Sequence, residues 1–142
     1  MTPEDLRFTE IEHKFLVDDQ FDLAVFETTL RDLGPEKTTS IQVRDRYYLT
    51  AGGQAGGFLI RHRFDPELHH LTLKAVGPDT EARSEINLDL GHHAGDQQAA
   101  VDAFLDRLGV EWRGTLQKDL RVWQFADIEV VHYCATTETR AV

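Results

Sequence analysis

Three short stretches of the sequence carry charged residues at every second position, and a fourth stretch of alternating residues ends in a single lysine. This alternation is typical of β-strands, in which neighbouring side chains point to opposite faces. Each stretch would therefore carry one charged face and one apolar face. Lys14 belongs to the first stretch. The other charged positions are four cations, Arg61, Arg63, Lys74 and Arg83, and three carboxylates, Glu10, Glu12 and Glu85.

This mixture of charges has the chemistry to hold a polyphosphate. Guanidinium groups make forked hydrogen bonds to phosphate oxygens, and clustered carboxylates can bind a hard divalent cation that bridges phosphates. Such faces could line a cavity, although burying many charges is costly unless they pair or bind a ligand. The alternation predicts equally well a flat antiparallel sheet whose charged face is salt-bridged and solvated.

Seven strands and two helices are predicted to position these residues. The helices have one apolar face each, which is expected to cover the apolar side of the sheet, and they span residues 21–33 and 97–108. The glycine-rich stretch 51–57 is predicted to be a flexible turn. The strands are expected at residues 9–17, 41–49, 58–64, 69–75, 83–90, 114–124 and 128–134.

The composition is that of an ordinary globular protein, with 41% hydrophobic and 28% charged residues. Its 142 residues fit one domain, expected to span residues 1–142. The net charge of −10 argues against a nucleic-acid partner. No apolar run is long enough to cross a bilayer, so no membrane partner is expected. Cys134 is the only cysteine, which excludes an intrachain disulfide and suits a cytoplasmic location.

Some residues that could bind metals or cofactors have plainer interpretations. Adjacent histidines in a strand face opposite ways, so no histidine is assigned to a metal. His13 and His62 fall on the apolar faces and are expected to pack under helices. Tyr47 and Tyr48 also face opposite ways, so one of them could line a cavity. Cys134 is expected to be a buried strand residue.

Five motifs, in order and with matching spacing, resemble those of the CYTH superfamily, also called the triphosphate tunnel metalloenzymes. The superfamily takes its name from class IV adenylate cyclases and thiamine triphosphatases. Its ExExK signature matches residues 10–14, and this motif alone would be weak. The others resemble the D-x-Y-Y, L-R-I-R, T-x-K and R-x-E strands of that family, and they lie at residues 44–48, 59–63, 71–74 and 83–85.

The resemblance implies an α+β fold: an antiparallel barrel of eight strands, closed into a tunnel, with two or more helices packed outside. It implies a triphosphate-containing small molecule as ligand, and Mg²⁺ or Mn²⁺ as cofactor. Carried over by position, Glu10, Glu12 and Glu85 would hold the metal. Lys14 and Glu12 would be catalytic. The phosphates would be bound by Lys14, Arg61, Arg63, Lys74 and Arg83.

The family's reaction is attack on the triphosphate by water or by a ribose hydroxyl. Hydrolysis of tripolyphosphate or of a nucleoside or thiamine triphosphate is favoured here. One alternative is cyclisation of ATP, as in class IV adenylate cyclases. An alternative of another class is a non-catalytic domain that binds polyphosphate or nucleotide.

The sequence departs from the family pattern in its last third. The family's K-x-R strand has both cations on one face, whereas Lys118 and Arg121 are three residues apart and would face opposite ways. The family's last strand, which carries two carboxylates, is missing, so the domain is C-terminally short relative to the family. The barrel would then be closed by residues 137–142 folding back as a short strand, or by a second copy in a homodimer.

Overall fold

The computed structural model describes residues 7–64, 69–77, 82–91 and 97–137, with the backbone alone described for residues 7–10, 82 and 83. Seven strands form one antiparallel sheet in the order β1-β5-β4-β3-β2-β6-β7. The strands are β1 (Arg7–Ile11), β2 (Lys37–Thr50), β3 (Phe58–Phe64), β4 (His69–Ala75), β5 (Ala82–Asp89), β6 (Val110–Gln124) and β7 (Glu129–Thr137).

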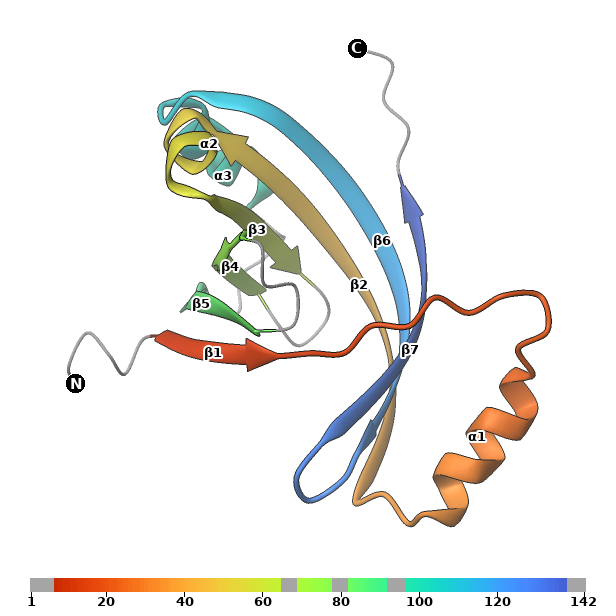
Figure 1. Ribbon diagram of the computed structural model, residues 1–142. Coiled ribbons are helices and arrows are strands. Elements are labelled where there is room, and N and C mark those ends of the chain that lie inside the picture. Colours follow the sequence, from red (N-terminus) through yellow and green to blue (C-terminus); the bar gives the residue numbers. More distant parts are fainter. Residues whose placement is uncertain (1–6, 65–68, 78–81, 92–96, 138–142) are drawn as a thin grey trace.

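The sheet curls strongly, and β1 and β7 are its two ends (Figure 1). The antiparallel α+β architecture is therefore confirmed. A closed barrel is not seen in the described residues, where β1 and β7 each pair with one neighbour and not with each other. The predicted foldback strand is wrong at its first residue, since Thr137 belongs to β7 and lies opposite Leu116. Residues 138–142 lie outside the described residues.

The strand predicted at residues 9–17 is shorter than its alternating pattern indicates. β1 ends at Ile11, which pairs with Ala82 at the first residue of β5. Residues 12–18 have no regular secondary structure, and Phe15 and Leu16 are almost fully exposed. Alternation favours a strand only where a neighbouring strand supplies hydrogen bonds, and in the described residues β5 supplies none beyond Ile11.

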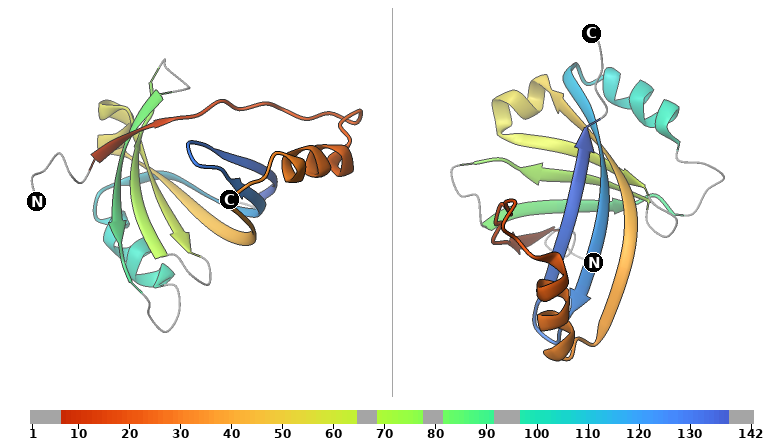
Figure 2. Two further views of the ribbon diagram at one scale, coloured as in Figure 1. Left: turned by 90° about the horizontal axis from the view of Figure 1, so that it is seen from below. Right: turned by 90° about the vertical axis from the view of Figure 1, so that its right-hand side faces the viewer.

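Three helices accompany the sheet: α1 (Leu23–Asp32), α2 (Ala51–Gly56) and α3 (Gln98–Asp106). The two longer helices, α1 and α3, lie against different parts of the convex side of the sheet (Figure 2). Within the described residues no helix is long and apolar enough to span a membrane.

The glycine-rich stretch predicted to be a flexible turn is helix α2. The Thr50 hydroxyl caps it by accepting a hydrogen bond of 3.0 Å from the amide of Gly53. Gly57 ends it in the left-handed region at φ +72°. A Cβ atom at Gly53 would come within 2.4 Å of the carbonyl oxygen of Phe58. This glycine therefore permits close packing on β3 and does not serve as a flexible link.

The apolar core lies on the convex side, between the sheet and the helices. Under α3, Leu105 and Val101 pack against the fully buried Tyr48. Under α1, the ring of Phe26 meets Trp123 edge to face, with 5.7 Å between centroids. The apolar strand faces thus point outward under the helices, as the sequence predicts, and the opposite face is left on the concave side.

Ionic contacts also hold α3 to the convex side. Asp102 of α3 accepts hydrogen bonds from Arg46 Nε at 3.0 Å and from the hydroxyl of Tyr48 at 2.5 Å. Arg46 also donates to the hydroxyl of Thr115 at 3.1 Å. Burial and the bond to Asp102 raise the pKa of Tyr48 above its usual range, so this hydroxyl remains a donor at physiological pH.

Candidate functional site

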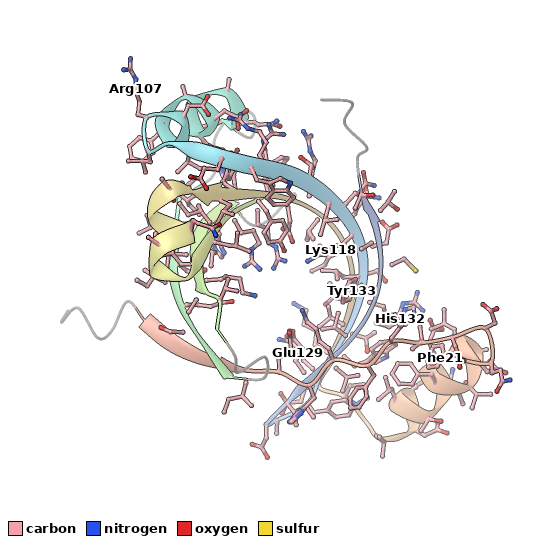
Figure 3. The ribbon with its side chains drawn as sticks, turned by 45° about the horizontal axis from the view of Figure 1, so that its top comes forward. Phe21, Arg107, Lys118, Glu129, His132 and Tyr133 are labelled. Atoms are coloured by element: carbon pink, nitrogen blue, oxygen red, sulfur yellow. The ribbon has the colours of Figure 1, made fainter. Side chains whose placement is uncertain are left out.

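The charged strand faces meet on the concave side of the sheet, which we call the inner face. The strand register sets Asp45 beside Arg63 and Tyr47 beside Arg61 across β2 and β3. The same face continues through β4 and β5, where Lys74 lies beside Glu85. On β6 and β7 it includes Lys118 and Tyr133, which point inward in Figure 3, whereas His132 points out toward α1.

The centre of the inner face is the carboxylate of Asp45, which has no exposed surface. Arg63 binds it with a fork of two hydrogen bonds, from Nε to Oδ1 and from Nη2 to Oδ2, both of 2.7 Å. The ammonium group of Lys118 lies 3.0 Å from Oδ2, and the hydroxyl of Tyr47 lies 3.5 Å from the same atom. One buried carboxylate thus holds two cations from different strands in place.

The electrostatics of this cluster favour the ionised carboxylate. Burial alone would raise the pKa of Asp45, but the hydrogen bonds and the charge of Arg63, together with nearby cations, outweigh it. Lys118 and Arg61 add further attraction, and the pKa of Asp45 is lowered from its ordinary value of 3.8. Asp45 is therefore charged throughout the physiological pH range.

Arg61 is a buried cation of this face that has no counter-ion of its own among the described residues. It is 8% exposed, and its Nε is buried without a hydrogen-bond partner there. Leaving a buried charged donor unsatisfied is costly in a folded protein. The two carboxylate oxygens of Asp45 are already engaged by Arg63 and Lys118. Arg61 is therefore available to bind an anion.

The other buried part of the inner face lies on β4 and β5. Lys74 Nζ forms an ion pair of 3.1 Å with Glu85, which is 2% exposed. Beside this pair, the fully buried Thr72 donates a short hydrogen bond to Asn87. Together, the buried and half-buried part of the inner face holds four cations against two carboxylates. They are Arg61, Arg63, Lys74 and Lys118, against Asp45 and Glu85.

Glu12 and Lys14 do not join this cluster. Because β1 ends at Ile11, both lie in the extended segment that follows, where they pair with each other at 3.1 Å. Their side chains are 41% and 62% exposed. The prediction that they share a strand face with Glu10 is therefore wrong.

Glu10 and Arg83 are paired in register across β1 and β5, two positions along β5 from Glu85. Their side chains lie outside the part of the structure that is described. Within the described residues, no three histidine, cysteine or carboxylate side chains come close enough to hold a metal ion. The expected carboxylate triad is thus not assembled there, since Glu12 faces solvent and Glu85 is paired with Lys74.

Two residues at the centre of the cluster, Asp45 and Lys118, have no role assigned to them from the sequence. Asp45 stands in the D-x-Y-Y motif, two residues before Tyr47, and this spacing puts both on one strand face. Lys118 does face away from Arg121, as predicted. Arg121 lies on the convex side and pairs with Glu27 of α1 at 2.7 Å.

Other predictions about single residues have mixed outcomes. Tyr47 faces the cluster and Tyr48 packs in the core, as their alternation predicts. His62 is buried on the convex side, with its Nε2 2.8 Å from Nε2 of His69. His13 and Cys134 are exposed, which contradicts the expectation that they are buried.

Comparison with known proteins gives a family match for the chain. The sequence pattern of the CYTH domain matches residues 9–132, which is most of the chain. No curated protein matches it. CYTH domains bind triphosphates, and proteins of this family are generally enzymes that depend on divalent cations. The match includes the strands that build the inner face, except for the start of β1 and the part of β7 after residue 132. This chain belongs to the CYTH domain family.

Proposed function

We propose that this protein binds the triphosphate group of a small molecule on the inner face and hydrolyses it with the help of Mg²⁺ or Mn²⁺. The observation that carries the proposal is Arg61, a buried cation whose Nε has no partner among the described residues. It lies beside Arg63 and Lys118 in a cluster with more cations than carboxylates. A polyphosphate supplies the missing negative charge and several acceptor oxygens.

The distribution of charge supports a small anionic ligand. The chain as a whole carries a net charge of −10, yet the buried and half-buried part of the inner face that the structure describes holds more cations than carboxylates. A nucleic acid needs a broad basic surface. A local cluster of buried cations on the concave side suits a compact polyanion that enters it.

In this proposal the phosphates are held by the cations predicted from sequence, with Lys118 added. Arg61 and Arg63 would bind phosphate oxygens directly, and Lys74 would turn from Glu85 toward the ligand. Arg83 would extend the cluster on β5. Positioning and neutralisation of the phosphate charge would supply most of the rate acceleration, because phosphoryl transfer needs little covalent chemistry from the protein.

The proposed cofactor site is the β1–β5 end of the inner face. Carboxylate oxygens are the donors that Mg²⁺ and Mn²⁺ prefer, so Glu10, Glu12 and Glu85 have suitable chemistry to hold such an ion. When bound, the ion would neutralise phosphate charge. Glu12 and Lys14 reach the ligand only if the segment after β1 moves toward the inner face, because in this structure they pair with each other in solvent.

A second candidate is a non-catalytic domain that binds a polyphosphate or nucleotide. The solvent-exposed Glu12–Lys14 pair favours it, since the described carboxylates do not gather into a metal site. Cyclisation of ATP is the alternative reaction of the same site. In each of these functions, the gap between β1 and β7 would be closed by the chain after Thr137 or by a second copy of the protein. Residues 1–142 would form one domain.

One assay separates these functions. The purified protein is incubated with tripolyphosphate, ATP or thiamine triphosphate in Mg²⁺, Mn²⁺ or EDTA, and the products are identified. A triphosphatase releases phosphate in a metal-dependent manner, whereas a cyclase releases pyrophosphate and a cyclic nucleotide. Binding of a triphosphate without any turnover identifies the non-catalytic domain. The absence of both binding and turnover contradicts the proposal.

A further inference from the structure

The inner face has two halves of different chemistry. The half on β3, β4 and β5 carries the described buried and half-buried cations except Lys118, which lies on β6. The half on β6 and β7 is mainly apolar, because successive rows across β2, β6 and β7 bring uncharged residues together. One row is Ile41–Leu120–Tyr133, and the next is Thr39–Val122–Val131. We call the inner-facing residues Leu120, Val122, Val131 and Tyr133 the apolar half.

The apolar half departs from the charge pattern expected of this family. Two residues after Lys118, on the same strand face, the family's K-x-R strand would carry a second cation, and here the residue is Leu120. The phosphates would therefore be held by the β3, β4 and β5 half together with Lys118, and not by the residues beyond Lys118 on β6. Tyr133 is 41% exposed and Val131 is 39% exposed, so this surface is accessible in the structure.

Lys118 joins the two halves. Its ammonium group lies 3.0 Å from Oδ2 of Asp45 and 5.5 Å from the centroid of the Tyr133 ring. An exposed aromatic ring thus lies beside the cationic cluster, and both contact the same ammonium group. A ligand with a polyphosphate at one end and a flat ring at the other matches this arrangement, because aromatic rings stack on tyrosine while the charged end meets the cations.

We infer that the apolar half is a subsite for the organic group of a triphosphate ester, with an aromatic ring stacked on Tyr133. The substrate class is then an aromatic triphosphate ester and not inorganic tripolyphosphate. This inference rests on the proposed function, since it assigns the other end of the same ligand. It adds a residue, Tyr133, that determines specificity without contacting the phosphates.

The test compares three probes in binding titrations with EDTA, which prevents metal-dependent turnover: ATP, thiamine triphosphate and tripolyphosphate. Tyr133→Ala is expected to weaken binding of at least one ester by about tenfold, because that is a typical loss for one aromatic stacking partner. Its affinity for tripolyphosphate is expected to stay within about twofold of wild type. Tyr133→Phe keeps the ring and is expected to bind like wild type. A loss of affinity for ATP alone would indicate that the subsite binds a purine, and a loss for thiamine triphosphate alone would indicate that it binds a thiamine ring system.

Two outcomes overturn the subsite while leaving triphosphate binding intact. One is an equal loss of affinity for all three probes in Tyr133→Ala, which would indicate a general structural effect. The other is unchanged affinity for both esters. If wild type binds none of the three probes, with or without Mg²⁺, the proposed function itself fails. Circular dichroism checks that each variant folds, which is expected because Tyr133 lies half-exposed on the end strand β7.

Discussion

Asp45 and Arg63 lie opposite each other on β2 and β3 and are joined by a fork of two 2.7 Å hydrogen bonds. The carboxylate is fully shielded from water, and the arginine side chain is 21% exposed. The pair therefore fixes one arginine at the surface of the inner face, and together with Lys118 it engages both carboxylate oxygens of Asp45. Its neighbour Arg61 is left as a buried cation for a ligand.

Replacing Asp45 with asparagine should destabilise the unliganded protein strongly. Arg63 and Lys118 would then be buried without their shared counter-ion, and breaking such a buried pair costs about 3 kcal/mol or more. Urea unfolding at neutral pH measures the loss. An unfolding free energy equal to that of wild type would show that the cluster is solvated and not held by Asp45.

The same carboxylate should make stability depend on acid pH. Its pKa is lowered in the folded protein from the ordinary value of 3.8. Its stabilising contribution is therefore complete above about pH 4, and it is lost as the pH falls through the folded-state pKa. The difference in unfolding free energy between wild type and Asp45→Asn should be constant from pH 5 to 8 and shrink below pH 4. A difference that grows on acidification would contradict the assignment.

Replacing Arg61 with glutamine should weaken triphosphate binding by about tenfold or more, because one charge-assisted contact contributes roughly 1.5–3 kcal/mol. The unliganded variant should unfold at a higher urea concentration than wild type, since a buried cation without a counter-ion among the described residues has been removed. Arg121→Gln is the matched control, because Arg121 is exposed on the convex side and pairs with Glu27. Equal losses of affinity in both variants would point to a general charge effect.

Removing the carboxylate of Asp102 tests whether the two sides of the sheet act independently. Asp102→Ala would leave Arg46 buried without its ion pair and should lower the unfolding free energy by about 3 kcal/mol. Affinity for tripolyphosphate at low temperature should stay unchanged, because the contacts of Asp102 lie on the convex side. A large loss of affinity in the folded variant would mean that α3 shapes the inner face.

Glu10→Gln and Glu12→Gln test the proposed metal ligands. Each should abolish metal-dependent turnover while the variant still folds, because a neutral amide cannot replace a carboxylate on a hard divalent ion. Glu111→Gln is the control, since Glu111 is exposed at the start of β6. Unchanged turnover with normal metal dependence in both variants would remove these residues from the site and favour the non-catalytic domain.

Much of the sheet could be predicted from sequence because alternation is a local property that the folded sheet preserves. Arg61 and Arg63 lie on one face of β3, as their two-residue spacing predicts. Lys74 of β4 and Glu85 of β5 lie on the same inner face. The convex placement of the helices also follows from their apolar faces. Motif order then identified the family before any geometry was known.

Other features depend on contacts that the sequence pattern does not encode. The alternation of residues 9–17 continues past Ile11, but β1 ends where its partner strand begins. The glycines of 51–57 predict a flexible link, whereas the close approach of the Phe58 carbonyl oxygen to Gly53 shows that a glycine is needed there for packing. Asp45 stood in a motif, yet its role depends on Arg63 and on Lys118, which is 73 residues away in sequence.

The central claim is that buried cations of the inner face bind a triphosphate. It is tested most directly by isothermal titration of tripolyphosphate into wild type, Arg61→Gln and Arg121→Gln, with Mg²⁺ in both solutions. Wild type and Arg121→Gln should bind one equivalent with the same affinity, and Arg61→Gln should bind about tenfold more weakly or not at all. Equal affinity of all three proteins, or no binding by wild type, would contradict the account.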